Sequence, residues 1–222
     1  MKIIIPAKKN SNRVPNKNWR PFYEDKNLVE IKIEQILRCV NPKDVFLSTD
    51  FLEMEQLANH YNINFLLRNP IYSSDETPWP DALLGIIKNT PFVENEDIAW
   101  VEVINPLFDD YIALFEKWQL VKENYDSIVL VSPINKFLLH SDGRPVNFQF
   151  GKWHAMSQNL DPLYAWDSAC IMQKKNLLYF SYPIGKKPFL FSTGNQCIDI
   201  DTFDDFELAQ YYYSKKIKNE NK

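Results

Sequence analysis

The amino-acid sequence predicts an α/β fold built on a mostly parallel, doubly wound sheet. Short apolar runs alternate with segments of helical spacing from residue 2 to residue 131, and this alternation is typical of parallel strands joined by right-handed crossovers. Several runs stop at a Pro or at a polar residue, where loops at the carboxyl edge of such a sheet bind ligands. The chain has 222 residues, 45% of them hydrophobic, so we expect one domain over residues 1–222 with one substantial core.

The alternating elements can be assigned in order along the chain. Strands are recognised as short apolar runs, and helices as longer segments with aliphatic side chains three or four positions apart. We expect strands at 2–5, 45–48, 64–67, 98–104 and 127–131, and helices at 28–40, 52–61, 82–87 and 111–123. Residues 68–80 are rich in Pro, Ser, Asp and Thr and are predicted to form a loop.

The chain closes with two further strands and a helix. Strands are expected near residues 169–172 and at 197–201, and a helix from Phe203 to Lys218. Asp201 or Thr202 can cap this helix, because their side-chain oxygens accept hydrogen bonds from the first free backbone N–H groups.

Residues 133–161 interrupt the alternation. Asp142-Gly143 is a hairpin signal, and it lies among aromatic and aliphatic residues: Phe137, Leu138, Leu139, Phe148, Phe150 and Trp153. A solvated loop would not carry so many apolar side chains, so the segment packs either on the core or on a second subunit. We favour a β-ribbon at 135–156 that forms a homodimer.

Composition excludes several classes of protein. A net charge of −4 and a pI near 5.5 argue against nucleic-acid binding, which needs a basic surface. The three cysteines show no CxxC spacing, so neither a disulfide framework nor a zinc site is indicated. With neither a leader pattern nor an apolar run of 18 residues, we expect a cytoplasmic protein that does not enter the membrane.

The loop after the first strand carries a local basic patch. Residues 6–18 include four basic side chains, a Ser and four Asn, at the edge where an α/β sheet binds its ligand. This pattern favours a cradle for a triphosphate, although a solvated basic turn would have the same composition.

Two carboxylates near the C-terminus suggest a metal site. Asp199 and Asp201 are two residues apart in the run Cys197 to Thr202, so in a strand they would share one face. Mg²⁺ prefers oxygen ligands from one or two carboxylates together with substrate phosphates. The plain alternative is that one Asp caps the following helix.

Together the two ends of the chain resemble the CMP-sugar-acid synthetases, the cytidylyltransferases that make CMP-sialic acid and CMP-KDO. The matching segments occur in the order that the family uses and span nearly the whole chain, with most similarity to the sialic-acid branch. They are Ile4 to Lys8 with Ser11 and Pro15 to Asn18, Phe46 to Asp50, Arg68 with Asp75, Asn105 to Leu107, and Ile198 to Thr202 with Asp205-Phe206.

The resemblance implies a nucleotidyltransferase fold, CTP and a sugar acid as substrates, and Mg²⁺ as cofactor. The implied nucleotide-binding residues are Ala7, Lys8, Ser11, Lys17, Asn18, Arg68 and Thr77. Lys8, Lys17 and Asp201 are the implied catalytic residues, and Asp199 and Asp201 the metal ligands. The acceptor would be bound by Glu102, Asn105, Gln158 and Asp167. Trp79 either forms part of the loop wall or stacks on cytosine.

The sequence departs from the family pattern mainly in the predicted acceptor pocket. Lys8 replaces an Arg, which keeps the charge but loses the bidentate fork. Glu102 replaces a Gln, Asn105 a Ser, and Asp167-Ser168 an Asn-Gly pair, while Ser157 replaces the Arg just before Gln158. An acidic pocket would repel a carboxylate unless basic residues compensate or an amine on the acceptor pairs with the acids.

Four functions fit these features. The favoured one is a CMP-sugar-acid synthetase with an unusual acceptor. The others are a nucleotidyltransferase of the same fold for a phosphonate or sugar phosphate, a non-catalytic nucleotide-binding paralogue, and a metal-dependent glycosyltransferase. The DxD pair of a glycosyltransferase usually follows a mid-chain strand, so Asp199 and Asp201 lie too close to the C-terminus to favour that last function.

Overall fold

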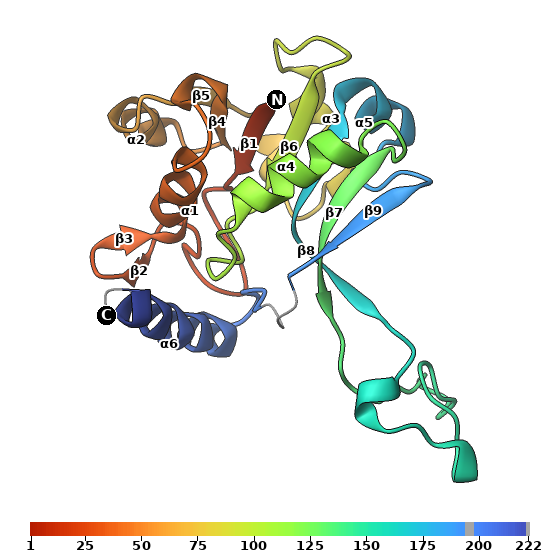
Figure 1. The fold of residues 1–222 in the computed structure, drawn as a ribbon. Coiled ribbons are helices and arrows are strands. Elements are labelled where there is room, and N and C mark those ends of the chain that lie inside the picture. Colours follow the sequence, from red (N-terminus) through yellow and green to blue (C-terminus); the bar gives the residue numbers. More distant parts are fainter. Residues whose placement is uncertain (194–197, 221–222) are drawn as a thin grey trace.

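A seven-stranded mixed sheet organises the computed structural model, which describes residues 1–193 and 198–220 (Figure 1). The strand order is β5-β4-β1-β6-β8-β7-β9. The strands are β1 (Lys2–Pro6), β4 (Val45–Thr49), β5 (Asn64–Leu67), β6 (Asp97–Val101), β7 (Ser127–Pro133), β8 (Tyr164–Gln173) and β9 (Pro188–Ser192). Neighbouring strands are parallel except that β8 runs antiparallel to both β6 and β7. The predicted mostly parallel sheet is therefore confirmed.

Helices cover both faces of the sheet, as in a doubly wound fold. The helices are α1 (Leu28–Leu37), α2 (Glu55–His60), α3 (Trp79–Lys88), α4 (Tyr111–Val121), α5 (Lys174–Phe180) and α6 (Phe203–Glu220). Alternate residues of β1 point to opposite faces: Ile3 and Ile5 belong to the core beneath α1, α4 and α6, whereas Ile4 packs with α3 and α5. This period of two buries β1 on both sides, as expected for a central parallel strand.

The helix ends follow the capping rules. Asn27 begins α1 and forms a capping box with Glu30. At the start of α6, the hydroxyl of Thr202 accepts from the N–H of Asp205 at 3.2 Å, and the Asp205 carboxylate accepts from the N–H of Thr202 at 2.8 Å. Of the two predicted caps, Thr202 is therefore the one used.

An arm formed by residues 134–163 projects from the end of β7 and β8, away from the body of the molecule (Figure 1). Regular pairing is confined to its base, where Val131 to Pro133 lie opposite Tyr164 to Trp166. Farther out, one bridge joins Leu139 to Pro145 across the predicted turn at Asp142-Gly143, where Gly143 has a φ of 85°. Around that turn, the N–H of Val146 donates to Leu138 O and the N–H of His140 to Arg144 O, each at 2.8 Å, and a 3-10 turn at Gly151–Trp153 follows.

The largest difference from the sequence-based prediction is the strand expected at 197–201. Residues 198–201 belong to no sheet, and Cys197 lies outside the described residues. The edge position beside β7 is taken by β9, which was not predicted. The alternation of Ile and Asp resembles the residue pattern of a strand. It arises here because the Ile200 side chain is fully buried, and the Ile200 N–H bonds Ile104 O at 3.1 Å.

Other differences are smaller. The strand expected at 98–104 ends at Val101, and the chain turns away at Glu102. The structure adds α5 and a hairpin formed by β2 (Pro21–Tyr23) and β3 (Lys26–Asn27). The first part of the helix expected at 52–61 is a 3-10 turn at Leu52–Met54. No helix among the described residues is both long and apolar enough to cross a membrane.

Candidate active site

The site lies where the carboxyl ends of β1, β4 and β6 meet. Parallel strands bring these ends to one edge of the sheet. The loop after β1 continues the sheet for one residue, since the N–H of Ala7 bonds Ser48 O at 2.9 Å. The N–H of Lys9 then bonds the Asp50 carboxylate at 2.9 Å. The predicted basic loop is thereby anchored to the ends of two neighbouring strands.

Internal hydrogen bonds shape the basic loop. The side chains of Asn18 and Trp19 both donate to Lys8 O, each at 3.0 Å. Asn18 is buried, and Val14 is fully buried beneath the loop. Asn16 adopts a left-handed backbone with φ of 56°, which Asn tolerates better than most residues. The amide nitrogen of Asn18 therefore supports the loop, and its predicted contact with ribose remains a prediction.

Lys8 points toward the loop that precedes α3. Its ammonium pairs with Asp75, and Asn12 donates to the other oxygen of the same carboxylate. The hydrogen bond from Lys8 lowers the pKa of Asp75. The Asp75 carboxylate thus already occupies the Lys8 ammonium, which was predicted to bind phosphate oxygens, and that contact stays a prediction. Ser11 lies on the same loop, half-buried.

Lys17 connects the basic loop to the C-terminal carboxylates. Its ammonium donates to Ile200 O and lies 3.8 Å from the Asp201 carboxylate. Arg13 also contacts Asp201, at 2.7 Å. Burial lowers the pKa of Lys17, and the charges of Asp201 and Asp199 only partly oppose this effect. The predicted catalytic residues Lys17 and Asp201 are therefore neighbours.

The two residues predicted to face the base lie at the adjoining edge. Arg68 is 9% exposed and donates to Ser48 O, while its Nε has no hydrogen-bond partner within the described residues. Burial lowers its pKa to about 10 despite the nearby charges of Asp50 and Glu102. Thr77 donates its hydroxyl to Ile71 O at 2.6 Å. Both side chains shape the loop over residues 68–78 that faces the sheet edge.

Asp199 and Asp201 lie in the segment before α6, although not in a strand. Burial, followed by the charge of Asp201, raises the pKa of Asp199 to about 6. No group of three or more His, Cys, Asp or Glu is placed to hold a metal ion within residues 1–193 and 198–220. Two carboxylates whose charges disfavour each other are nevertheless a pair that a divalent cation would stabilise, with phosphate oxygens completing its ligands.

A cavity of about 420 Å³ opens beside Asp199. Its walls combine acidic and aromatic side chains with one Pro and one Ile. The lining residues are Trp79, Pro80, Glu102, Ile104, Trp166, Asp167, Tyr182 and Asp199. Burial raises the pKa of Glu102, whose carboxylate accepts from the indole of Trp100 at 3.1 Å. The predicted acceptor residues Glu102 and Asp167 thus share one cavity.

Asn105 fixes the orientation of Asp167. Its side-chain nitrogen lies 3.0 and 3.1 Å from the two Asp167 oxygens, and its own oxygen accepts from the N–H groups of Leu107 and Phe108. Asp167 also accepts from the hydroxyl of Ser132 at 3.1 Å and from the N–H of Ser168 at 2.6 Å. Asn105 is therefore a buried positioning residue behind the cavity wall.

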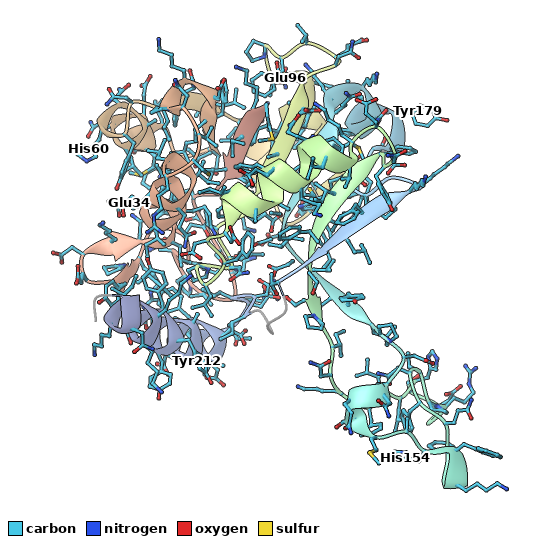
Figure 2. All side chains as sticks on the ribbon, viewed as in Figure 1. Glu34, His60, Glu96, His154, Tyr179 and Tyr212 are labelled. Carbon is cyan, nitrogen blue, oxygen red and sulfur yellow. The ribbon has the colours of Figure 1, made fainter. Side chains whose placement is uncertain are left out.

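Gln158, the fourth predicted acceptor residue, is not brought to this cavity within the chain. It is exposed on the arm, where its side chain contacts Met156. His154 marks the outer part of the arm in Figure 2, far from the sheet edge. The structure therefore does not bring Gln158 together with the other predicted acceptor residues, and its contact with the acceptor stays a prediction.

Trp166 and Tyr182 are cavity residues that the sequence-based prediction missed. Trp166 lies on β8 and Tyr182 in the loop after α5, about 90 to 100 positions beyond Trp79 along the chain. Their only local signal was an aromatic side chain at the end of an apolar segment, and core residues have the same appearance.

A sequence model described as cytidylyltransferase matches residues 2–136. Curated relatives named N-acylneuraminate cytidylyltransferase are 23% identical in Streptococcus agalactiae serotype V, over 91% of this chain, and 26% identical in Escherichia coli, over 96%. These alignments span 51% and 52% of the relatives, so the chain covers about half of their length.

Solved structures with the same fold include three transferases or synthases. A CMP:2-keto-3-deoxy-manno-octonic acid synthetase in complex with CTP has a TM-score of 0.69 and 13% identity, covering 97% of this chain and 98% of its own. A putative glucose-1-phosphate thymidylyltransferase from Bacillus anthracis has a TM-score of 0.66 and 15% identity, covering 95% and 94%. A 4-diphosphocytidyl-2C-methyl-D-erythritol synthase from Anaerococcus prevotii has a TM-score of 0.63 and 11% identity, covering 96% of each chain.

Proposed function

This chain belongs to the cytidylyltransferase family, and we propose that it transfers CMP from CTP to the hydroxyl of a sialic-acid-like (nonulosonic) sugar acid, releasing pyrophosphate. The observation that carries the proposal is the placement of the basic loop beside the carboxylates. Lys17 lies 3.8 Å from Asp201, at the carboxyl edge of the sheet. The curated relatives named N-acylneuraminate cytidylyltransferase support the choice of acceptor.

The proposed reaction is a displacement at the α-phosphorus of CTP. The acceptor hydroxyl oxygen forms a bond to this phosphorus, and the bond to the bridging oxygen of the β-phosphate breaks. Pyrophosphate leaves with that electron pair, and the hydroxyl proton passes to a base or to water. Such transfers depend mainly on positioning and on neutralising charge. Lys8 and Lys17 would bind oxygens of the triphosphate, Lys8 after releasing Asp75.

The residues around Asp199 fit a magnesium ion. Burial and mutual repulsion raise the pKa of Asp199 to about 6, so a divalent cation bound by Asp199 and Asp201 would relieve an unfavourable arrangement. A bound Mg²⁺ would withdraw charge from the phosphate oxygens. Arg13, which contacts Asp201 at 2.7 Å, would then turn toward the triphosphate.

We propose that the arm forms the homodimer contact. Its exposed apolar side chains include Phe150 at 59%, Trp153 at 68% and Met156 at 68%, and such a patch usually marks an interface. The arm also carries basic residues, namely Lys136, Arg144, Lys152 and His154. On reaching a second subunit, these basic residues would supply the positive charge that the acidic acceptor cavity lacks for a carboxylate, and Gln158 would supply a neutral hydrogen-bonding group. The protein is expected to act in the cytoplasm.

The test is pyrophosphate release with Mg²⁺, using CTP, UTP, ATP and GTP against sialic, legionaminic, pseudaminic and KDO-type acids. Release with CTP and one acid is expected. Release with a sugar phosphate or phosphonate instead would replace the sugar-acid acceptor. If CTP binds but no pyrophosphate forms with any acceptor, the chain is a nucleotide-binding protein without transferase activity.

A further inference from the structure

The cavity beside Asp199 has the composition of a cation site. Five of its lining residues are aromatic or aliphatic, and the remaining three are acids. No Lys, Arg or His lines it in the part of the chain that the structure describes. The carboxylates of such walls repel an anionic group, whereas a cation is attracted by both the carboxylates and the faces of the rings.

Three aromatic rings stand at steep angles to one another along the cavity wall. The ring centroids of Trp79 and Trp166 are 5.5 Å apart with an interplanar angle of 80°, and those of Trp79 and Tyr182 are 5.4 Å apart at 73°. Trp166 and Tyr182 complete the set at 5.7 Å and 57°. Trp166 remains 40% exposed. The rings therefore pack on one another and form one aromatic wall, and the parts of their faces that stay uncovered can contact a cation.

The acids of the cavity have no salt-bridge partner among the described residues. Asp167 is held there by neutral donors, from Asn105, Ser132 and the Ser168 backbone. Glu102 accepts from the neutral indole of Trp100. None of Glu102, Asp167 and Asp199 lies within 4.0 Å of a basic side-chain nitrogen among residues 1–193 and 198–220. A bound cation would therefore meet carboxylates that no internal salt bridge has already neutralised.

Neither pairing with Lys17 nor binding of a metal ion explains the composition of the whole cavity. The Lys17 ammonium is directed to Ile200 O and toward Asp201, on the side of the basic loop. The three acids are not grouped closely enough to hold a metal within the described residues. A metal would also gain nothing from the three aromatic faces, which suit a large and weakly hydrated cation.

We propose that the acceptor carries an ammonium group, either a protonated amine or a quaternary nitrogen, and that this group lies in the cavity against the aromatic wall formed by Trp79, Trp166 and Tyr182 and faces Glu102. This inference rests on the proposed function, because it names a feature of the molecule that receives CMP. The hydroxyl that attacks CTP would point toward Asp199 and the basic loop. The cavity would then select for the amine and against N-acylated analogues, whose amide nitrogen is neutral.

Binding can be tested without catalysis. Choline and 3,3-dimethyl-1-butanol have nearly the same shape, but only choline is charged, and its charge does not vary with pH. Their affinities for the full chain would be compared by tryptophan fluorescence. We expect choline to bind about 5- to 30-fold more tightly, the range that cation–π and carboxylate contacts supply. Equal affinity, or no binding of either probe, would overturn the proposal.

Substitutions of the aromatic residues show where the cation binds. Trp166→Leu removes an exposed ring face and should abolish the preference for choline, whereas Tyr182→Phe keeps the ring and should retain most of it. Tyr179→Leu, which removes an exposed ring on α5 outside the cavity, is the control and should bind like the original protein. Loss of preference in Tyr179→Leu, or its persistence in Trp166→Leu, would show that the cation binds elsewhere. Competition between choline and CMP would show that the aromatic wall binds the cytosine base, and this result would also overturn the proposal.

A matched acceptor pair separates this inference from the proposed function. Pyrophosphate release from CTP would be compared between 9-amino-9-deoxy-N-acetylneuraminic acid and its 9-acetamido counterpart. Faster release with the amine supports both ideas. Equal release with both acids supports the sugar-acid function and refutes the ammonium requirement. A choline preference without release from any acid supports the ammonium site and refutes the sugar-acid acceptor.

Discussion

Replacing Lys17 by Met should separate catalysis from folding. The change keeps the length and most of the apolar volume of a side chain that is 12% exposed, while removing its charge. One preorganised group that stabilises developing charge is worth about 3–4 kcal/mol in comparable enzymes. We therefore expect kcat/KM for pyrophosphate release to fall about 100- to 1000-fold.

The same change should leave stability nearly unaltered. Losing the hydrogen bond to Ile200 O costs about 1 kcal/mol, and losing the attraction to half-exposed Asp201 costs at most about 1 kcal/mol after solvent screening. Burial lowers the pKa of Lys17, so the charge is unfavourable overall in the folded state, and removing it offsets these losses. A net change within about 1 kcal/mol corresponds to about 2–4 °C in Tm for a chain of this size.

Lys216→Met is the matched control for Lys17→Met. Lys216 also donates to a backbone carbonyl, Leu107 O at 2.9 Å, and also pairs with an acid, Asp109 at 2.6 Å, but it lies on α6 away from the basic loop. Its replacement should leave kcat/KM unchanged. The reasoning fails if Lys17→Met retains activity within about threefold, or if its Tm falls by more than about 10 °C, because the activity loss would then reflect unfolding.

Three further predictions follow from the site and the arm. Asp199→Asn should lower turnover about 100-fold and raise the Mg²⁺ concentration needed for half-maximal rate; an unchanged Mg²⁺ titration would remove Asp199 from the metal site. Burial raises the pKa of Glu102, so its ionisation destabilises the folded state only above the pKa of the unfolded chain, about 4.3. Glu102→Gln should therefore match the original Tm below that pH and exceed it at higher pH, with the difference levelling off above the pKa of the folded state; a difference that does not vary with pH would contradict this. Trp153→Asp should shift sedimentation from twice the 26.2 kDa protomer to the protomer itself, and a particle of one unchanged size would refute the role of the arm.

The sequence identified the basic loop because the apolar strand before it and the charged residues within it are both local features of the chain. The apolar run Lys2 to Ile5 is buried between β4 and β6, and Pro6 ends it as the Pro pattern indicated. In the structure three of the basic side chains that follow pair with Asp75 or Asp201, and their role in binding a triphosphate stays a prediction. The position of the loop was predictable, and the structure places it at the carboxyl edge.

The segment around Asp199 shows where such signals fail. Alternating Ile and Asp predicts a strand, but the same alternation appears whenever two Ile side chains anchor an extended segment to a core. Only the sheet order distinguishes the two cases, since β9 already occupies the edge beside β7. Such pairing joins residues about 60 positions apart in the chain, as between Val129 and Leu190, and no local pattern encodes it.

The aromatic cavity was beyond prediction for a similar reason. Trp79 was singled out as a wall or a stacking partner, but Trp166 and Tyr182 join it only after three separate elements have packed. The acids Glu102 and Asp167 were recognised by their difference from a family pattern, so the sequence indicated an altered acceptor pocket. It could not indicate that aromatic rings line the same space.

The central claim is that this chain joins CMP to an acceptor through the α-phosphorus of CTP. The most direct measurement is ³¹P NMR of the reaction with Mg²⁺ and an amine-bearing sugar acid whose attacking hydroxyl carries ¹⁸O. The account predicts a new phosphodiester resonance with the isotope shift of a P–¹⁸O bond, together with pyrophosphate. Formation of free CMP and pyrophosphate without the shifted resonance would show hydrolysis instead of transfer, and would contradict the account.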